Sequence, residues 1–201
     1  MTIGIIDYQA GNLGSLSTAL TELGLKFFVS DKPSEILKST LILIPGVGSM
    51  SSGMKIIRDS NLDKAIINHA KAGKPVLGIC LGMHLLATSG LEGGRTQGLN
   101  LIPGEISRLK PAEGFRVPHM GWDEVKYEQT STFVYFAHSY YFKNDLNPAI
   151  RVLSEFQAGK DRYPAHIQLE NVAGIQFHPE KSGAAGLGIL AEAIETLLAK
   201  P

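Results

Sequence analysis

Apolar runs and turn-forming segments alternate along the first half of the chain. The run Ile3–Ile6 is continuously apolar, as in a buried strand, and the turn-rich segment DYQAGN follows it. Apolar residues at spacings of three and four then predict a helix that ends at Gly24; they are Leu13, Leu16, Leu20 and Leu23. Strands are predicted at 26–29, Leu41–Ile44 and Val76–Ile79, with another helix over 61–72. This alternation predicts a parallel sheet with right-handed crossovers.

The second half, from about residue 99, changes to short segments rich in β-branched and aromatic residues. We expect segments 133–136, 150–156 and 172–177 to be mixed or antiparallel strands added to the same sheet. A final helix is predicted over 184–199, with one apolar stripe for a sheet face; it comprises Leu187, Leu190, Ile194 and Leu197. The expected fold is therefore α/β: a single domain over residues 1–201, with a central, mostly parallel sheet that carries mixed or antiparallel additions and is flanked by helices.

Composition indicates a globular protein without an obvious nucleic-acid or membrane partner. The 201 residues are 44% hydrophobic and 19% charged, and 19 basic residues balance 19 acidic ones. A neutral chain has no electrostatic reason to prefer nucleic acid or an anionic membrane. The apolar runs are far shorter than the ~20 residues that cross a bilayer. Because the N-terminus also lacks the features of a signal peptide, we expect cytoplasmic residence.

The one cysteine, Cys80, cannot form an internal disulfide and lies in the segment VLGICLGMHLL. An apolar strand runs into a G-x-C-x-G arrangement, the thiol counterpart of the nucleophile elbow. In this sharp strand-to-helix turn, small residues such as Gly78 and Gly82 avoid collisions. The turn presents the sulfur at the carboxyl end of a strand, and the following helix N-terminus favours the thiolate. A buried structural cysteine is the alternative interpretation.

A cysteine nucleophile needs a base and a group that orients the base, and the segment GIQFHPEKS contains both. Residues two apart in an extended segment face the same side, so His178 and Glu180 are expected to face one crevice. Pro179 restricts its own backbone and that of His178. In this hypothesis His178 takes the thiol proton and later protonates the leaving group, while Glu180 orients the imidazole. An isolated His-x-Glu is more often a surface pair, so the hypothesis depends on the elbow.

The segment LILIPGVGS supplies a glycine-containing loop after a strand. Gly46 and Gly48 allow backbone N–H groups of this loop to approach a ligand closely. The amide of Leu81, just after the cysteine, is one natural oxyanion donor, and an amide of this loop is a candidate for the second. An ordinary strand-to-helix turn remains the alternative, whereas a phosphate-binding P-loop is excluded because the G-x-x-x-x-G-K-[ST] pattern is missing.

Seven segments in this order resemble the class I, or triad-type, glutamine amidotransferases, and within them the glutaminase subunits of imidazole glycerol phosphate synthase. The resemblance spans nearly the whole chain. The segments are IGIIDYQAGN at the start, IPGVGS at 44–49, GICLGMHLL at 78–86, GLNLIPGEI at 98–106, VPHMGWDEV at 117–125, HSYYF at 138–142 and GIQFHPEKSG at 174–183. The elbow and FHPE occur across the superfamily, whereas VPHMGW and HSYYF point to this branch.

The resemblance implies a role for each matching residue. Cys80, His178 and Glu180 correspond to the catalytic triad. A second set corresponds to the oxyanion loop and the glutamine contacts; it comprises Val47, Gly48, Leu81, Ser139 and Tyr140. In such enzymes the thiolate attacks the side-chain amide of glutamine, ammonia leaves, and water releases glutamate from the thioester. No cofactor takes part.

The resemblance also implies a protein partner, a (β/α)₈-barrel cyclase subunit that forms a heterodimer with the glutaminase. That subunit uses the ammonia to form imidazole glycerol phosphate and an aminoimidazole carboxamide ribonucleotide in histidine biosynthesis. The positions of the family's docking face correspond to His119, Met120, Trp122 and Lys181. From sequence physics alone, however, Met120 and Trp122 are better interpreted as a plug in the core.

Two positions depart from the family pattern. His84 stands where the family usually has glutamine, four residues beyond Cys80 and therefore on the same helix face, so it is expected to border the substrate pocket. Imidazole lacks the paired donor and acceptor of an amide, so an altered affinity for glutamine is expected. Gln9 stands where glycine is common, in a loop near the predicted docking face.

Three other functions stay open from the sequence. A paralogous glutaminase subunit that supplies ammonia for the amination of surface-glycan sugars shares these motifs. A stand-alone thiol hydrolase or protease needs no docking face, which the VPHMGW segment argues against by resemblance. A regulatory scaffold without turnover is argued against by the intact candidate triad. Metal catalysis is not expected, because the six histidines are scattered and the H-E-x-x-H and paired-cysteine patterns are missing.

Overall fold

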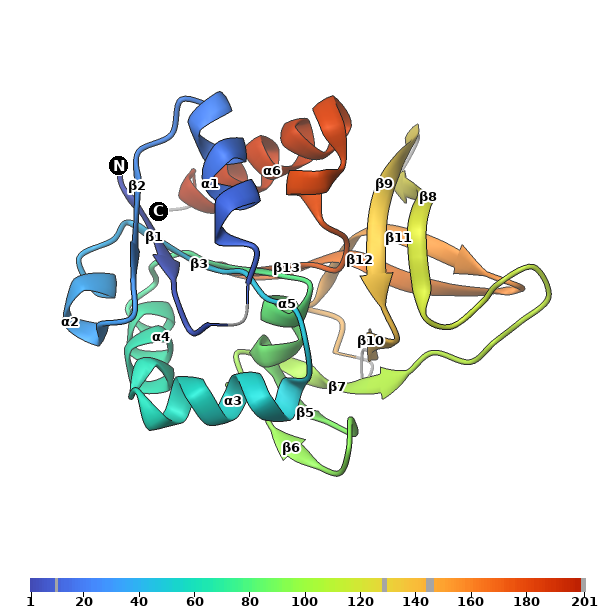
Figure 1. Cartoon of the computed structure of the whole chain (residues 1–201), viewed down its shortest axis with the longest axis horizontal. Coiled ribbons are helices and arrows are strands. Elements are labelled where there is room, and N and C mark those ends of the chain that lie inside the picture. The colour runs from blue at the N-terminus through green and yellow to red at the C-terminus, as the bar shows by residue number, and fades with distance from the viewer. Residues whose placement is uncertain (10, 128–129, 144–146, 200–201) are drawn as a thin grey trace.

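A nine-stranded sheet runs through the molecule (Figure 1). The computed structural model describes residues 1–9, 11–127, 130–143 and 147–199. The strands of this sheet are β1 Ile3–Ile6, β2 Phe27–Ser30, β3 Leu41–Ile44, β4 Val76–Ile79, β8 His119–Tyr127, β9 Thr130–His138, β11 Arg151–Ala158, β12 Asp161–Leu169 and β13 Val172–Ile175. Their order is β2-β1-β3-β4-β13-β12-β11-β8-β9. The first five strands pair in parallel and the remaining pairs are antiparallel, which confirms the expected α/β fold class.

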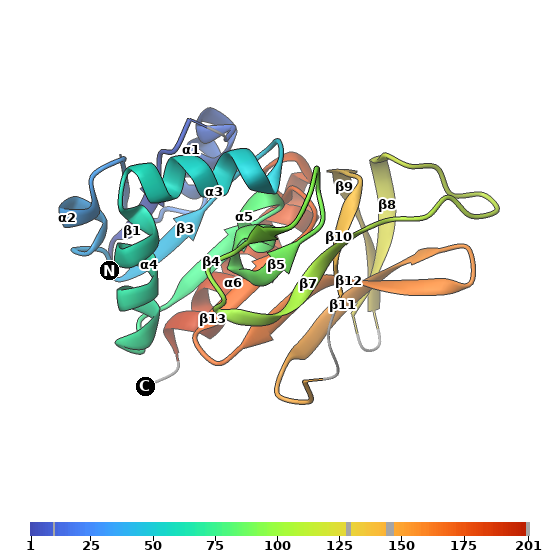
Figure 2. The same cartoon turned by 90° about the horizontal axis from the view of Figure 1, so that it is seen from below.

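Helices cover both faces of the sheet. They are α1 Leu13–Glu22, α2 Pro33–Ile36, α3 Met50–Asp59, α4 Leu62–Lys71, α5 Leu81–Leu86, the 3₁₀ turn η1 Pro179–Lys181, and α6 Gly183–Leu198. Helices α1 and α6 lie on one face, and α3 and α4 lie on the other (Figures 1 and 2). Among the described residues, no helix has the length and apolarity needed to cross a membrane.

The buried strands divide their side chains between two cores, one on each face. Leu41 and Leu43 of β3 pack in the core under α1 and α6, whereas Ile42 and Ile44 pack in the core under α3 and α4. Successive side chains of a strand point to opposite faces, so a strand covered on both sides must be apolar throughout. The continuous apolar runs seen in the sequence therefore have a direct structural cause.

Several elements of the first half differ from the prediction, among them helix α2, which was not predicted. Strand β2 begins and ends one residue later than the predicted segment 26–29. Helix α3 was not predicted, although its signals are present: the Ser49 side chain caps the N-terminus by accepting a hydrogen bond from the backbone N–H of Ser52. Met50, Met54 and Ile57 are buried at helical spacing.

The three segments expected to extend the large sheet do so, as β9, β11 and β13, but other strands of the second half do not join it. Four strands form a second sheet in the order β10-β7-β5-β6; their bounds are β5 Ala87–Gly90, β6 Thr96–Gln97, β7 Ile102–Arg108 and β10 Tyr140–Lys143. Strand β9 ends at His138 and β10 begins at Tyr140, so the chain passes between the sheets at Ser139. Such a switch leaves the alternation of apolar residues intact, so hydrophobic periodicity does not reveal it.

Candidate active site

The three sequence motifs meet at one edge of the large sheet. Strand β4 lies between β3 and β13, and all three run in parallel. Their carboxyl ends lead directly into the PGVG loop, Cys80 and the FHPE segment. Ligand crevices of α/β sheets open at the carboxyl ends of parallel strands. Adjacency of the three strands thus brings together segments that are far apart in the sequence.

Cys80 occupies a strained turn between β4 and α5. Its backbone has φ +53° and ψ −108°, and the residue is 5% exposed. A Cβ added at Gly82 would lie 1.8 Å from the carbonyl oxygen of Ile44, and one at Gly78 would lie 2.5 Å from the backbone of Gly82. The positive φ of a cysteine is rare and costs free energy, and such strain gathers at functional sites. The geometry confirms the predicted elbow.

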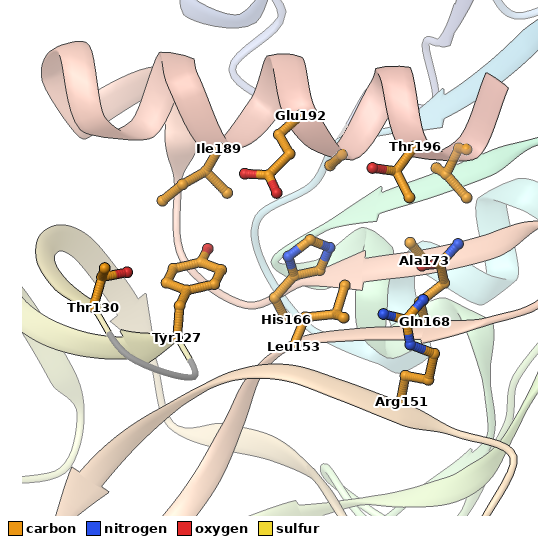
Figure 3. Close-up of a pocket in the computed structure, with 12 residues that line it drawn as sticks. Tyr127, Thr130, Arg151, Leu153, His166, Gln168, Ala173, Ile189, Glu192 and Thr196 are labelled. Atoms are coloured by element: carbon orange, nitrogen blue, oxygen red, sulfur yellow. The ribbon is translucent and has the colours of Figure 1, made fainter. Parts of the chain in front are cut away.

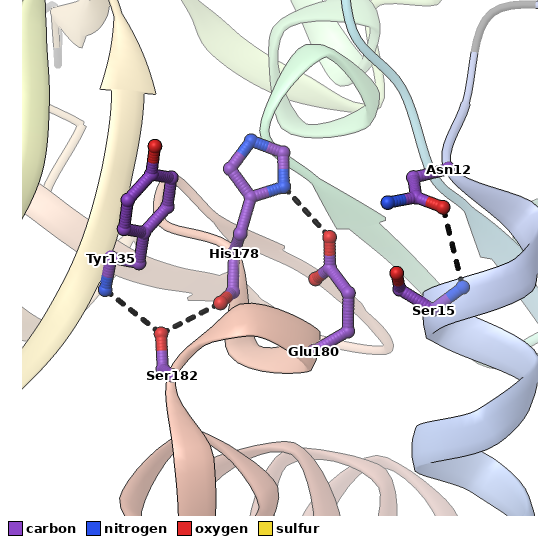
Figure 4. A network of polar contacts seen from close by, with 6 residues as sticks. All are labelled: Asn12, Ser15, Tyr135, His178, Glu180 and Ser182. Atoms are coloured by element: carbon purple, nitrogen blue, oxygen red, sulfur yellow. Dashed lines mark hydrogen bonds and ion pairs between the residues drawn. The ribbon is translucent and has the colours of Figure 1, made fainter.

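His178 and Glu180 are in direct contact, as their sequence spacing suggested. Nδ1 of His178 donates a hydrogen bond to Oε1 of Glu180 over 2.8 Å (Figure 4). Both side chains are buried, at 3% and 5% exposure. The predicted reason was wrong, however, because residues Pro179–Lys181 form a 3₁₀ turn rather than an extended segment. The turn, and not strand alternation, folds the carboxylate back to the imidazole.

The pKa of His178 is set by two neighbours, Cys80 and Glu180. Burial lowers the pKa of His178, but interactions with Cys80 and then with Glu180 outweigh burial and raise it to about 10. Nε2 of His178 is buried without a hydrogen-bond partner in this arrangement. Catalytic hydrogen bonds are often loose before substrate binds. This nitrogen is thus free to exchange a proton with the sulfur or with a leaving group.

Ser182 holds the histidine backbone in place, a role that sequence reasoning missed. Its hydroxyl donates to the carbonyl oxygen of His178 over 2.6 Å and accepts from the backbone N–H of Tyr135 over 2.8 Å (Figure 4). These bonds tie His178 to Tyr135 of β9, the edge strand of the large sheet. The signal was its position within the GIQFHPEKSG segment, two residues beyond Glu180.

The PGVG loop lies against the elbow with a carbonyl facing it. The backbone N–H of Leu81 donates to the carbonyl oxygen of Gly46 over 3.3 Å, so the predicted oxyanion donor is already engaged. Tyr8, also missed from the sequence, donates from its buried hydroxyl to the carbonyl oxygen of Pro45 over 2.6 Å. Burial, and then the charge of Cys80, raises the pKa of Tyr8, so this donor keeps its proton. Gly48 has φ +102°, a conformation that favours glycine.

A cleft of about 350 Å³ opens beside Cys80. The side chains predicted to bind substrate line it together with the cysteine; they are Val47, Gly48, Leu81, His84, Ser139 and Tyr140. The structure adds residues that the sequence did not single out, among them Ser49, Glu92 and His138. His178 and Glu180 lie behind this cleft, where they line a small cavity of about 10 Å³ with Gly46 and Val47. The predicted nucleophile thus faces the cleft, and its predicted base lines the smaller cavity.

His84 borders the cleft, but its ring is hydrogen-bonded to another side chain of this chain. Its Nε2 donates to Oε1 of Gln176 over 2.8 Å, and the residue is 5% exposed. Burial lowers the pKa of His84 to about 4, while hydrogen bonds to Gln176 and to the backbone of Tyr140 oppose this. The imidazole is therefore neutral near pH 7.

The predicted docking residues fall into two groups. Met120 and Trp122 are 65% and 57% exposed, so the interpretation of these side chains as a core plug is wrong. Gly121, at φ +118°, lies between them in β8. Lys181 is exposed as well, with its ammonium 5.8 Å from the centre of the Tyr135 ring. His119 differs, because its side chain is buried at 6% exposure and faces the interior.

A larger cavity, of about 540 Å³, lies beneath α6 (Figure 3). His166 and Gln168 point into it from β12, and Glu192 approaches from the helix. The chain's one cysteine does not line it. Its buried histidine is neutral, because burial and then the charge of Arg151 lower the pKa of His166 to about 4. Volume alone therefore does not locate the reactive centre.

Within the described ranges, no cluster of three or more His, Cys, Asp and Glu residues is arranged to hold a metal ion.

Comparison with protein families gives one match that spans most of the chain. Residues 4–194 match the family described as Glutamine amidotransferase class-I. The chain is 44% identical over 202 residues to "Imidazole glycerol phosphate synthase subunit HisH" of Bacillus velezensis, covering 94% of each chain. It is 39% identical over 206 residues to the protein of the same name from Carboxydothermus hydrogenoformans, covering 98% of this chain and 100% of that relative.

Solved structures show the same fold at lower sequence identity. A structure described as "Crystal structure of glutamine amidotransferase" aligns with a TM-score of 0.80 and 18% identity, covering 98% of this chain and 99% of that chain. PurLQS from Thermotoga maritima contains a similar chain, with a TM-score of 0.71 and 19% identity. At such identities the likeness establishes the fold alone.

Proposed function

The chain belongs to the class-I glutamine amidotransferase family and, within it, to the HisH subunits of imidazole glycerol phosphate synthase, and we propose that it hydrolyses glutamine through Cys80, His178 and Glu180. The observation that carries the proposal is the strained, buried cysteine beside a histidine that is hydrogen-bonded to a buried glutamate. Both relatives are named as HisH subunits, which favours histidine biosynthesis over the surface-glycan alternative. Residence in the cytoplasm and a single domain over residues 1–201 are part of the same proposal.

The first chemical step is attack by the Cys80 thiolate on the side-chain amide carbon of glutamine. The carbonyl π electrons move to oxygen and form a tetrahedral intermediate. His178, protonated because its pKa is about 10, gives its Nε2 proton to the amide nitrogen. The C–N bond then breaks, ammonia leaves, and a thioester to Cys80 remains. Glu180 keeps Nδ1 of the imidazole protonated and stabilises its positive charge.

The second step is hydrolysis of the thioester. His178, now neutral, removes a proton from water as the water oxygen attacks the thioester carbon. Collapse of the second tetrahedral intermediate expels the thiolate and releases glutamate. Ser139 and Tyr140 line the cleft at its far side and are the proposed contacts of the substrate, together with His84.

Both tetrahedral intermediates need hydrogen-bond donors for their oxyanion. In the resting enzyme the loop after β3 occupies one of these donors, so we expect almost no glutaminase activity without the partner. The Leu81 N–H donates to Gly46, and so it is not free for the oxyanion. We propose that the Pro45–Gly48 loop reorients, which frees Leu81 and turns an N–H of Val47 or Gly48 into the cleft. Removal of one such donor costs about 10²- to 10³-fold in kcat. Gly48 makes the reorientation feasible, since glycine adopts both signs of φ.

A protein partner is the proposed trigger and the proposed acceptor of ammonia. Met120 and Trp122 form an exposed apolar patch, a kind of surface that marks protein interaction sites. Lys181 follows Glu180 in the 3₁₀ turn Pro179–Lys181. The proposed partner is a (β/α)₈-barrel cyclase subunit that binds this face and receives ammonia without its release to solvent.

The test is glutamate release from glutamine by the purified chain, alone and with the barrel subunit from the same genome plus the ligand of that subunit. Strong stimulation by the liganded partner, abolished by Cys80→Ala, is the expected result. The same Cys80→Ala complex should still turn over with free ammonium salts, which shows that the partner is intact. Equal activity with and without the partner contradicts the gated mechanism, and activity of Cys80→Ala contradicts the triad.

A further inference from the structure

Two buried histidines lie next to each other beside the cleft but outside the proposed triad, with their rings in an edge-on arrangement. His119 of β8 and His138 of β9 are directly opposite each other in the strand register. Nδ1 of His119 is 3.1 Å from Nε2 of His138. His138 lines the cleft and immediately precedes Ser139 and Tyr140, the proposed substrate contacts. A group that orients His138 therefore also influences the position of Ser139 and Tyr140 in the lining of the cleft.

The hydrogen bonds at the two ends of this pair fix how many protons it holds. At one end, Nδ1 of His138 is 2.8 Å from the carbonyl oxygen of Tyr140, which only accepts. At the other end, Nε2 of His119 is 2.8 Å from Oδ2 of Asp123, and a carboxylate only accepts. Each end needs one proton, and the contact between the rings needs a third. Two neutral imidazoles carry only two, so the complete chain contains one imidazolium.

The surroundings place the extra proton on His119. His138 is the poorer place, because burial lowers its pKa well below the ordinary value and the charges of His119, His84 and His178 lower it further. His119 alone touches a carboxylate. Burial is the larger effect and leaves the pKa of His119 below its ordinary value, while the hydrogen bond and charge of Asp123 oppose burial and favour the cation.

Aromatic rings also favour a cation at His119. The centre of its ring is 4.3 Å from that of Phe136, in a stacked arrangement. The rings of Phe115 and Phe156 lie at 4.8 Å, each tilted against it. A cation within about 6 Å of an aromatic face is stabilised by the ring quadrupole. Three such rings partly replace the water that burial removes.

Gly121 explains how one strand supplies both members of the charged pair. In an unbent strand, residues four apart are separated by about 13 Å. His119 and Asp123 nevertheless meet, because the strand turns at Gly121, whose φ is +118°. An L-residue rarely adopts this conformation. The contact is therefore built into the backbone of β8.

We propose that Asp123 and a doubly protonated His119 are positioning residues that hold His138, and through it the Ser139–Tyr140 backbone, in the shape that binds glutamine. This inference rests on the proposed glutaminase function for its consequence, though not for its proton count. When His119 loses its second proton, two lone pairs face each other at one contact of the chain. The repulsion weakens the contact that holds His138, and the Ser139–Tyr140 backbone becomes less ordered. KM for glutamine therefore rises as the pH increases through the titration of His119.

The proton count is tested by nuclear magnetic resonance of the isotope-labelled full chain, which reports protonation at each histidine nitrogen. Protons on both Nδ1 and Nε2 of His119, with one proton on Nδ1 of His138, are expected at mildly acidic pH, because the pKa of His119 lies below its ordinary value. Asp123→Asn supplies an amide that donates to Nε2, so His119 should hold a single proton in that variant. A singly protonated His119 in the unaltered chain at every pH from 5 to 8 overturns the proposal.

The functional consequence is tested by glutamine kinetics of the chain assembled with its barrel partner, across the same pH range. Asp123→Ala should raise KM about tenfold with little change in kcat, since it removes a charged hydrogen bond but leaves the triad intact. Asp123→Asn should keep a low KM and lose its pH dependence. Glu124→Gln is the matched control on the same strand and should behave as the unaltered chain. An unchanged KM in Asp123→Ala contradicts the positioning role.

The two measurements separate this inference from the proposed function. The resonance experiment needs no turnover, so it still decides the proton count if the chain proves inactive on glutamine. If glutamine is turned over through Cys80 and His119 is singly protonated, the positioning inference alone is wrong.

Discussion

The cleft beside Cys80 and the cavity beneath α6 both contain buried polar side chains, yet only one is arranged for covalent chemistry. The α6 cavity is the larger, at about 540 Å³ against about 350 Å³. Its His166 has a pKa lowered to about 4 by burial and then by Arg151. Behind the cleft, His178 keeps a pKa of about 10 because Cys80 and Glu180 outweigh burial.

The difference shows that reactivity is marked by backbone strain and by coupled charges rather than by volume. Cys80 holds a positive φ that its own side chain disfavours, and its neighbours leave no room for a relaxed turn. Among the described residues, His166 lacks a hydrogen-bonded carboxylate of the kind that Glu180 provides for His178, and its Nδ1 is buried without a hydrogen-bond partner. Strained and strongly shifted groups are the ones expected at catalytic sites.

The largest predicted effect comes from removal of the base. His178→Asn should lower kcat for glutamine roughly 10⁶-fold, as expected when one member of a catalytic triad is deleted. Steady-state glutamate release in the assembled complex is the measurement. Use of ammonium salts by the partner should be unaffected. A loss of less than tenfold contradicts the assignment of His178.

Glu180→Gln should be milder, with kcat lowered about 10²- to 10⁴-fold, because the orienting residue contributes less than the nucleophile or base. The pKa of His178 should also fall, since the Glu180 carboxylate helps to raise it. With a folded pKa near 10 against an ordinary 6.5, the stabilisation from this charge is complete below about pH 6.5. It is lost as the pH rises from about 6.5 to about 10, and in Glu180→Gln the loss should be smaller and should end at a lower pH. Denaturant unfolding across pH 6 to 10 measures the shift.

The elbow itself should tolerate no added side chain. Gly82→Ala places a Cβ 1.8 Å from the Ile44 carbonyl oxygen, so we expect destabilisation of roughly 3 kcal/mol or more. Gly188→Ala is the matched control in α6, where nothing lies within 4 Å of the added Cβ. It should be neutral or stabilising by about 0.5–1 kcal/mol. Equal unfolding free energies for the two variants, from urea titration, contradict the close packing of the turn.

His84→Gln tests the departure of this chain from its family. An amide at this position can hold Gln176 and also offer a donor and an acceptor to substrate. We expect KM for glutamine to fall roughly threefold with little change in stability. An unchanged KM removes this residue from the substrate contacts.

His166→Gln should have no effect on glutamine kinetics, although it alters the larger cavity. Its effect on kcat/KM should stay within the error of the assay, whereas the substitutions in the cleft change it. A drop of tenfold or more removes the distinction between the two sites.

The sequence predicted the parallel half of the fold well, because each buried strand there is a continuous apolar run. The predicted bounds of Leu41–Ile44 and Val76–Ile79 agree with the structure. The second sheet escaped prediction, because a change of sheet at Ser139 does not disturb the apolar alternation. Met120 and Trp122 were misjudged as core, since hydrophobicity alone does not separate a buried side chain from one on a docking face.

The motifs placed the candidate triad and most of the cleft, but not the groups that support them. Tyr8, Ser182 and Gln176 act through hydrogen bonds to residues 37, 47 and 92 positions away, for which a sequence has no local signal. The contact between His119 and Asp123 depends on the bend at Gly121, which only the backbone reveals. Long-range polar contacts are therefore the part of this site that the sequence alone does not predict.

The central claim, that glutamine reacts at Cys80 and not elsewhere, is tested most directly by covalent trapping. The assembled complex is treated with a glutamine analogue whose side-chain amide is replaced by an electrophilic ketone, and the adduct is mapped by mass spectrometry. The account predicts one adduct per chain, on Cys80, prevented by excess glutamine and missing in His178→Asn at short times. An adduct on a residue of the α6 cavity, or labelling of Cys80 that glutamine does not slow, would contradict it.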